Sequence, residues 1–226
     1  KNDDLYAFLY QRQCNRRKVS VGVSTEKLEQ IREFAAADQY FKLHLLEDTT
    51  AIGKVGKIAG IIDRQRLTNK SYHDELVHEI RWSAEEAETQ KDGIDLNLID
   101  LSPLEKTGFQ MAKQWSLMSQ VAQLKGGGAI EKMASDLLSK DTALGLISTP
   151  EISPEAYFNG GRFYQRLWLY STKIGVDWHP MPAMLYAFLR LEHGQGVGMT
   201  PEMQVEVGEL KHQFSHIVPM PAGAGG

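Results

Sequence analysis

The sequence predicts a mostly helical domain with two short strands. Apolar residues recur at helical spacing over most of the 226-residue chain. Two short segments have strand character instead: residues 41–46 alternate apolar and polar, and residues 143–148 form a short apolar run. The composition, 42% hydrophobic and 24% charged, is that of a globular protein with a sizeable core, and it excludes disorder, collagen and a coiled-coil rod. We therefore expect one domain over residues 1–226.

Two helices are expected before the first strand. Asp3 and the residue after it precede an i, i+3, i+4 apolar pattern, which predicts a capped helix running to about Cys14. The basic and then β-branched stretch 15–23 is expected to be a connector. Ser24 or Thr25 then caps a second helix. Its inner face is predicted to hold Leu28, Ile31, Phe34 and Ala35.

Four further helices are expected between the two strands. Helical spacing and helix starts place them at residues 51–67, 71–88, 102–124 and 129–138. The third begins with Ser102 as N-cap followed by proline, and glycines 126–128 end it. Residues 90–101 lack a helical period and contain the turn signal Asp92-Gly93.

After the second strand, a long aromatic helix is expected to begin at Ser153 and to stop at Gly175. Residues 176–182 are expected to form a proline-interrupted loop. Two more helices are expected at 183–191 and 201–214.

Charge and cysteine content narrow the class of protein. The net charge is −4, so there is no global electrostatic reason to bind nucleic acid. The single cysteine, Cys14, cannot form an internal disulfide, which favours a reducing, cytoplasmic setting. No apolar run approaches the roughly 18 residues of a membrane span. The first residue is not Met, and we expect the chain to be a fragment of a longer protein.

The densest positive cluster, Arg12 to Lys18, has two interpretations. Guanidinium groups match the oxygens of a phosphate, so the cluster could bind one. Alternatively, it is a solvated helix end, where cations suit the macrodipole. The loop 176–182 is similarly open: two prolines could hold it flat against a planar ligand, or it is a packed connector.

The other motifs give weaker evidence for a functional site. Glycine pairs occur without the strand, turn and helix of a dinucleotide site, and no histidine spacing matches a zinc site. Serine and cysteine lack the neighbours of a nucleophile. Asp92, Asp95 and Asp100 suit turns and caps better than a cation. Trp168 is expected in the core.

The order of several motifs resembles the nitroreductase-like flavoprotein superfamily. Arg12-Gln13-Cys14-Asn15-Arg16-Arg17 is similar to that family's R-x-[ST]-x-R segment, and closest to a branch found as twin domains or fused to an E1-like, ThiF-type adenylating domain. Further similar segments, in order, are His73–Leu76 with Arg81-Trp82, Asp92–Ile94, Leu101–Glu105, Gly161-Arg162, Gln165–Leu169 and Ile174–Val176. Together they span most of the chain.

The resemblance implies an α+β fold with helices around a small antiparallel sheet, and flavin mononucleotide (FMN) bound at the interface of a homodimer or of two fused domains. It implies that NAD(P)H reduces the flavin and that a nitro compound, quinone or similar small acceptor oxidises it. Arg12 and Arg16 would hold the phosphate, assisted by Cys14 and Asn15. The segment from Trp178 to Ala183 would lie against the ring. The implied cofactor-binding residues of this segment are Trp178, His179, Pro180, Met181 and Ala183.

The sequence departs from the family pattern at three positions that bear on cofactor binding. Cys14 stands where a hydroxyl is expected, and a thiol is a weaker donor. Residues 35–39 replace the segment that contacts the ring. Pro182 has no N–H to offer the flavin, which shifts that role to Ala183. Two alternatives therefore stay open: a catalytically reduced domain that sequesters flavin or partners an adenylating enzyme, and a helical regulatory domain without a small-molecule site.

Overall fold

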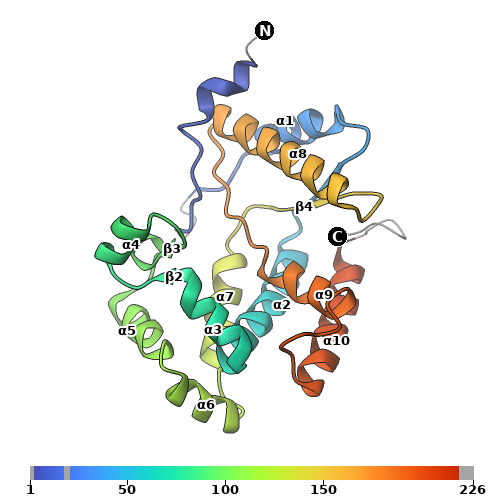
Figure 1. The fold of residues 1–226 in the computed structure, drawn as a ribbon. Coiled ribbons are helices and arrows are strands. Elements are labelled where there is room, and N and C mark those ends of the chain that lie inside the picture. The colour runs from blue at the N-terminus through green and yellow to red at the C-terminus, as the bar shows by residue number, and fades with distance from the viewer. Residues whose placement is uncertain (1–2, 18–20, 219–226) are drawn as a thin grey trace.

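The computed structural model describes residues 3–17 and 21–218. They form an α+β arrangement that is mostly helical (Figure 1). In chain order the elements are the 3-10 helix η1 (Asp4–Phe8), α1 (Thr25–Ala36), β1 (Lys42–Leu46), α2 (Thr49–Thr68), α3 (Lys70–Glu79), β2 (Ile80–Arg81), α4 (Ala84–Gln90), β3 (Ile94–Asp95), η2 (Leu96–Leu98), α5 (Pro103–Ala112), α6 (Trp115–Gln123), α7 (Gly128–Leu138), β4 (Leu144–Ser148), α8 (Pro154–Lys173), α9 (Ala183–Glu192) and α10 (Pro201–Ile217).

The two predicted strands pair with each other. β1 and β4 are antiparallel, with Lys42 opposite Ser148 and Leu46 opposite Leu144. This ribbon separates two groups of helices, since Leu43 packs against the cluster of α1 and α8, whereas Leu46 and Leu144 pack against that of α2, α9 and α10. Figure 1 shows α1 and α8 on one side of it and the remaining long helices on the other.

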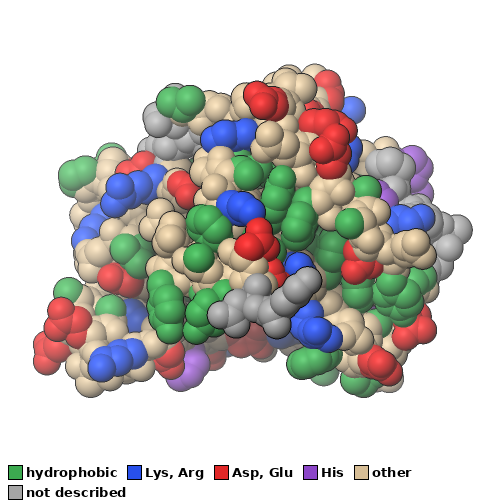
Figure 2. All heavy atoms as spheres, turned by 90° about the horizontal axis from the view of Figure 1, so that it is seen from above, with side chains coloured by type: hydrophobic (Ala, Val, Ile, Leu, Met, Phe, Trp, Pro, Cys, Tyr) green, Lys and Arg blue, Asp and Glu red, His purple; other side chains and the backbone are tan. Residues whose placement is uncertain are grey.

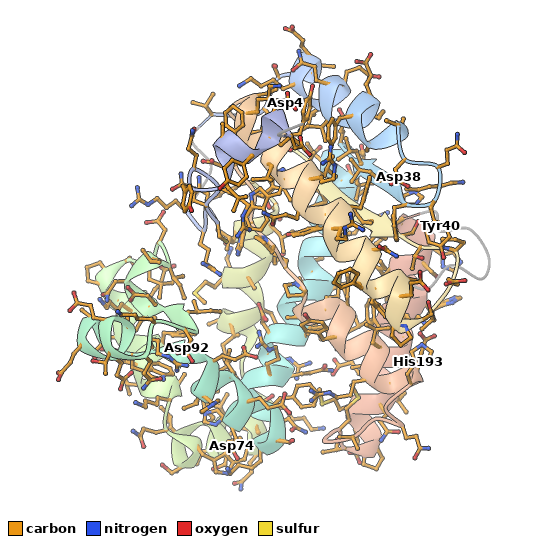
Figure 3. All side chains as sticks on the ribbon, turned by 45° about the horizontal axis from the view of Figure 1, so that its top comes forward. Asp4, Asp38, Tyr40, Asp74, Asp92 and His193 are labelled. Carbon is orange, nitrogen blue, oxygen red and sulfur yellow. The ribbon has the colours of Figure 1, made fainter. Side chains whose placement is uncertain are left out.

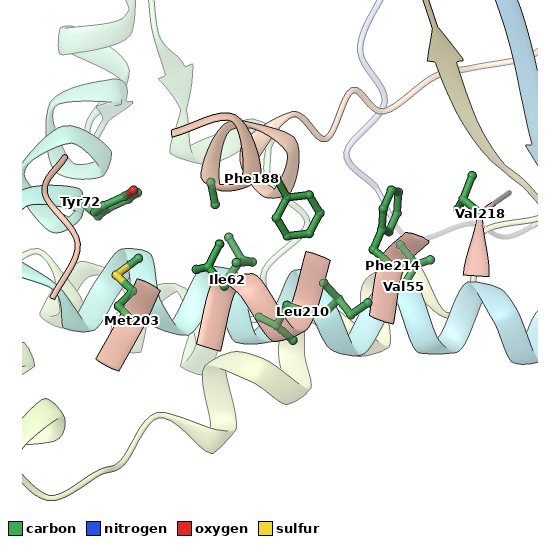
Figure 4. Close-up of a cluster of buried hydrophobic side chains, with 11 residues drawn as sticks. Val55, Ile62, Tyr72, Phe188, Met203, Leu210, Phe214 and Val218 are labelled. Atoms are coloured by element: carbon green, nitrogen blue, oxygen red, sulfur yellow. The ribbon is translucent and has the colours of Figure 1, made fainter. Parts of the chain in front are cut away.

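Three hydrophobic clusters stabilise the described part of the chain. One joins α2 to α9 and α10, with side chains such as Ile62, Phe188 and Phe214 in contact (Figure 4). A second lies between α1, β1 and α8 and includes Phe41 and Leu167. A third joins the end of α2 to α3, α5 and α6. Since each fully buried Leu, Ile or Phe contributes roughly 1.5–3 kcal/mol, these clusters fix how the helices sit.

Local signals place many of the predicted elements. Ser24 caps α1 through the backbone N–H of Lys27, and Ser102 forms a capping box with Glu105. Gly175 follows α8 with φ +71°, a conformation that glycine adopts without a steric penalty. The predicted inner face of α2 is buried at every position: Ile52, Val55, Ile58, Ala59 and Ile62.

The prediction of one helix over residues 71–88 is wrong. The chain leaves the helix at Ile80 and forms strand β2, which pairs in parallel with β3. Arg81 is buried there and donates to Asp92 at 2.8 Å. Ser83 then caps the separate helix α4. Neither β2 nor β3 was predicted, because each has two residues and no detectable alternation.

The predicted helix 102–124 is also divided in two. α5 ends at Ala112, whose carbonyl oxygen accepts a hydrogen bond from Nε2 of the buried His73 at 2.8 Å. Gln114 then takes an extended conformation, and α6 starts at Trp115. A tertiary contact, not a local breaker residue, therefore ends the first helix.

The first predicted helix is much shorter than expected. It is the 3-10 helix η1, which ends at Phe8 and buries Leu5 alone. It is tied to α8 by ion pairs of Asp3 with Arg166 and of Asp4 with Lys173 (Figure 3 labels Asp4). The cationic cluster begins just after this helix, since the backbone N–H of Arg12 donates to the Phe8 carbonyl oxygen at 3.0 Å, and the last cation of the cluster, Lys18, lies outside the described residues.

Candidate functional site

The two segments implicated by the sequence lie side by side, although more than 160 residues separate them. Cys14 and Trp178 form a parallel bridge, and the backbone N–H of Asn15 donates to the Trp178 carbonyl oxygen at 2.9 Å. The Asn15 side-chain amide donates to Asp177 Oδ2, also at 2.9 Å. These contacts fix the extended cationic segment, defined here as residues 12–17, against the loop that follows α8.

An aromatic cluster, defined here as Tyr164, Trp168 and Trp178, supports the cationic segment. The Arg12 guanidinium carbon lies 4.2 Å from the centroid of the Trp168 ring. Trp168 is buried and stacks on Trp178 with centroids 5.9 Å apart and planes 14° apart. Tyr164 meets both indoles edge-on, at 5.6 and 5.4 Å. Cation–π contact of this kind contributes about 0.5–2 kcal/mol and orients the guanidinium.

The arginines of this segment lack anionic partners in the described ranges, 3–17 and 21–218. Neither Arg12 nor Arg16 forms an ion pair there, whereas Arg81 and Arg190 each pair with a carboxylate. The Nε of Arg12 is buried and has no hydrogen-bond partner. Because a buried donor without a partner costs roughly 1–3 kcal/mol, this arrangement favours an anion beside Arg12.

Three titratable neighbours of these arginines, Cys14, Tyr164 and His179, stay uncharged near neutral pH. Burial raises the pKa of the Cys14 thiol, and Arg16 and Arg12 only partly oppose this. Burial raises the pKa of Tyr164 to about 12. Burial, and then repulsion from Arg16, lowers the pKa of His179. The arginines therefore carry the positive charge of the site, and Cys14 is not a thiolate nucleophile.

The loop after α8 leads directly into a helix start. Trp178 is half-buried and packs in the cluster of α1 and α8, so its ring forms a wall of the site. Pro180 and Met181 are also half-buried. Pro182 is the N-cap of α9 and makes no side-chain cap hydrogen bond. The first-turn N–H groups, beginning with that of Ala183, have no partner within the helix and can donate to a ligand.

Other candidate residues have structural roles. Asp92 pairs with Arg81, and Asp95 caps η2 by accepting from the N–H of Asn97. Asp38, in the segment that replaces the family's ring contacts, accepts from the N–H groups of Tyr40 and Phe41. These hydrogen bonds of Asp38 form the turn that precedes β1. Within the described ranges, no group of His, Cys, Asp or Glu side chains is placed to hold a metal ion.

Sequence reasoning missed Tyr164 and assigned Trp168 to the core without a functional role. Both lie on the same face of α8, four residues apart, which is the spacing that brings helix side chains together. That spacing was visible in the sequence, but the contact of Arg12 with Trp168 was not.

No helix in the described ranges combines the length and the apolar character needed to cross a bilayer.

Comparisons with known proteins place the chain in no family. No family model matches, and no solved structure matches. The chain is similar to an uncharacterized protein of Mycobacterium tuberculosis, MT1398, with 25% identity over 184 residues. The aligned segment covers 81% of this chain and 25% of that protein. The chain thus spans about a quarter of the length of the relative it matches.

Proposed function

We propose that this chain is an FMN-binding domain of the nitroreductase type, which takes electrons from NAD(P)H and passes them to a small acceptor such as a nitro compound or a quinone. The observation that carries the proposal is the pairing of Cys14 and Asn15 with Asp177 and Trp178, which brings the cationic segment against the start of the loop that leads to Ala183. The family resemblance makes the first segment the phosphate end of a flavin site and the second the ring end. The structure brings them together through Asn15 and Trp178.

The phosphate end fits an anion. Arg12 rests on Trp168 with a buried, unpartnered Nε, and Arg16 lies close enough to affect the pKa of Cys14 and His179. Each hydrogen bond to a charged group contributes roughly 1.5–3 kcal/mol, so one bond from each of two guanidinium groups contributes about 3–6 kcal/mol of the roughly 8 kcal/mol of micromolar binding, and contacts with the ring supply the rest.

The ring end offers a wall, a stiff loop and a helix start. The half-buried residues from Trp178 to Met181 exclude water from one side of a bound ring. The N–H of Ala183 is the donor nearest the start of α9 and replaces the one that Pro182 lacks. Bound flavin would supply hydride acceptance and electron transfer, and the protein would orient it and limit access.

A second protein surface belongs to this proposal. We infer that the chain works as a homodimer or beside a second domain, as the family resemblance implies. The length of the mycobacterial relative, four times the aligned segment, is consistent with further domains in related chains.

The alternative is a catalytically reduced domain that sequesters flavin or serves an adenylating partner. Asp38 favours it, because this residue caps a turn where the family has ring contacts. Turnover separates the two functions. A flavin-loaded sample that oxidises NADPH with a quinone or nitroarene supports the oxidoreductase, and a loaded sample without turnover supports the alternative.

The cofactor is tested by reconstituting the chain with FMN, desalting it and recording the flavin absorbance. We expect retained flavin in the wild type and at least tenfold weaker binding in Arg12→Ala. Arg162→Ala is the matched control, since that arginine is exposed on α8 and contacts Asn159. A wild type without flavin absorbance contradicts the proposal, and equal binding by all three proteins removes Arg12 from the site.

A further inference from the structure

We propose that the Tyr164 hydroxyl binds the same anion as Arg12, with Trp168 as the residue that positions Arg12. The inference rests on the proposed function in that the anion is taken to be the phosphate of FMN. It adds a third side chain, after those of Arg12 and Arg16, that binds the phosphate. This side chain is on α8, far from the cationic segment in sequence.

Tyr164 contacts the same two tryptophans as the cationic segment. Its ring packs edge-on against both Trp168 and Trp178, and Arg12 covers the Trp168 ring. Its phenol also interacts electrostatically with Cys14 and Arg12. The phenol therefore lies within electrostatic range of the thiol and the guanidinium, which come from a segment about 150 residues away.

The chemistry of the site leaves a place for a neutral donor. A phosphate monoester has several acceptor oxygens, and two guanidinium groups do not supply every donor it can use. The thiol of Cys14 is a weak donor. Tyr164 is protonated at neutral pH because its pKa is about 12, and its hydroxyl has no hydrogen-bond partner among the residues described. An incoming anion is the partner that this hydroxyl fits.

Trp168 acts through Arg12 and not on the anion itself. Its ring lies under the guanidinium, and its own Nε1 is buried without a partner. A ring at this position restricts Arg12 to one orientation, which lowers the entropy lost when an anion binds. Trp168→Phe keeps a ring there and is expected to retain most of the affinity, whereas Trp168→Leu is expected to lose it.

The test compares FMN with riboflavin, which has the same ring and no phosphate. Wild type is expected to bind FMN at least tenfold more tightly. Tyr164→Phe should weaken FMN binding roughly five- to tenfold, the effect of one lost hydrogen bond, and leave riboflavin binding unchanged. Tyr157→Phe, on the same helix and half exposed, is the matched control and should change neither. Circular dichroism and melting temperature check that each variant is folded.

The outcomes separate this inference from the proposed function. If Tyr164→Phe weakens both flavins equally or neither, the inference is wrong and the flavin site stands. If wild type binds neither flavin, the proposed function fails, and inorganic phosphate becomes the probe, read by tryptophan fluorescence. A phosphate response that is lost in Arg12→Ala and weakened in Tyr164→Phe then still supports an anion site with Tyr164. No response to phosphate overturns it.

Discussion

At the residue scale, the Cys14 thiol is the group in the phosphate end that most limits the affinity for FMN. Its thiol stays protonated and is a poor hydrogen-bond donor, while its backbone is held by the bridge to Trp178. Serine is close in size and donates better. We expect Cys14→Ser to tighten FMN binding about three- to tenfold, measured by fluorescence titration, with little change in melting temperature.

Cys14→Ala is the control for this prediction. It removes the donor without adding one, so its FMN affinity should stay within about twofold of wild type. Equal affinities for Cys14→Ser and wild type would show that position 14 does not face the phosphate. The backbone pairing alone would then be the function of this residue.

Asp141, which lies outside the candidate site, lowers the stability of the folded state when its carboxyl group is ionised. It follows α7 in a half-buried position, and burial raises its pKa from 3.8 to about 6. The folded state therefore binds this proton more tightly than the unfolded chain. The resulting stability is fully present below about pH 3.8 and is lost as the pH rises through 6.

Asp141→Asn should therefore stabilise the protein at pH 7 and leave its stability at pH 3.5 unchanged. Because the side chain is partly exposed to water, we expect a gain of about 1 kcal/mol in urea unfolding at pH 7. Asp136→Asn is the control, since that exposed carboxylate pairs with Lys132 on α7 and should change stability by less than about 0.5 kcal/mol. A gain that is the same at both pH values would contradict the burial argument.

At the scale of elements, the contact of α2 with α7 depends on small residues. A Cβ added to Gly60 would lie 2.4 Å from the Glu131 carbonyl oxygen, so the two helix backbones approach too closely for any side chain. Gly60→Ala should destabilise the fold by about 1–3 kcal/mol, since the helices must move apart. The free energy of urea unfolding measures this.

Gly53 in the same helix provides the matched control. A Cβ there meets no atom within 4 Å, so Gly53→Ala adds helix propensity without a clash. It should stabilise the protein by up to about 1 kcal/mol. If both substitutions have the same sign, the close approach of α2 and α7 does not determine stability.

The elements that local patterns predict are those whose causes are local. The apolar face of α2 and the caps at Ser24 and Ser102 depend on residues a few positions apart, and they were predicted correctly. The end of α5 depends on His73, about 40 residues away, and was not. The break after α3 had a local signal in Ser83, but the pairing of the buried Arg81 with the exposed Asp92 fixes it.

The candidate site also has parts that local sequence patterns predict and parts that depend on tertiary contacts. The cationic segment and the loop after α8 were both identified in the sequence, and the order of motifs suggested that they belong to one site. Their contact is a tertiary property that no spacing encodes. For the same reason Tyr164 was missed, because its role depends on the position of Arg12 above Trp168.

At the scale of the whole molecule, the face formed by η1, α1 and α8 is where we expect a second subunit. Phe158 is 70% exposed at the first turns of α8, and Tyr6 and Tyr10 are exposed near the other end. Figure 2 shows this face from above, with hydrophobic side chains between charged ones. Exposed aromatic residues of this kind are enriched in interfaces.

We therefore expect the purified chain to sediment at twice its 25.4 kDa mass, and Phe158→Glu to shift it to the monomer at the same concentration. Burying the introduced carboxylate without a partner would cost several kcal/mol, enough to weaken a dimer at least 100-fold. Tyr186→Glu changes an aromatic position of similar exposure on α9 and should leave the dimer intact. A monomeric wild type, or a Phe158→Glu variant that still dimerises, would place any second subunit on a different face. If Phe158→Glu also releases FMN, whereas Tyr186→Glu does not, the flavin site is completed by the partner.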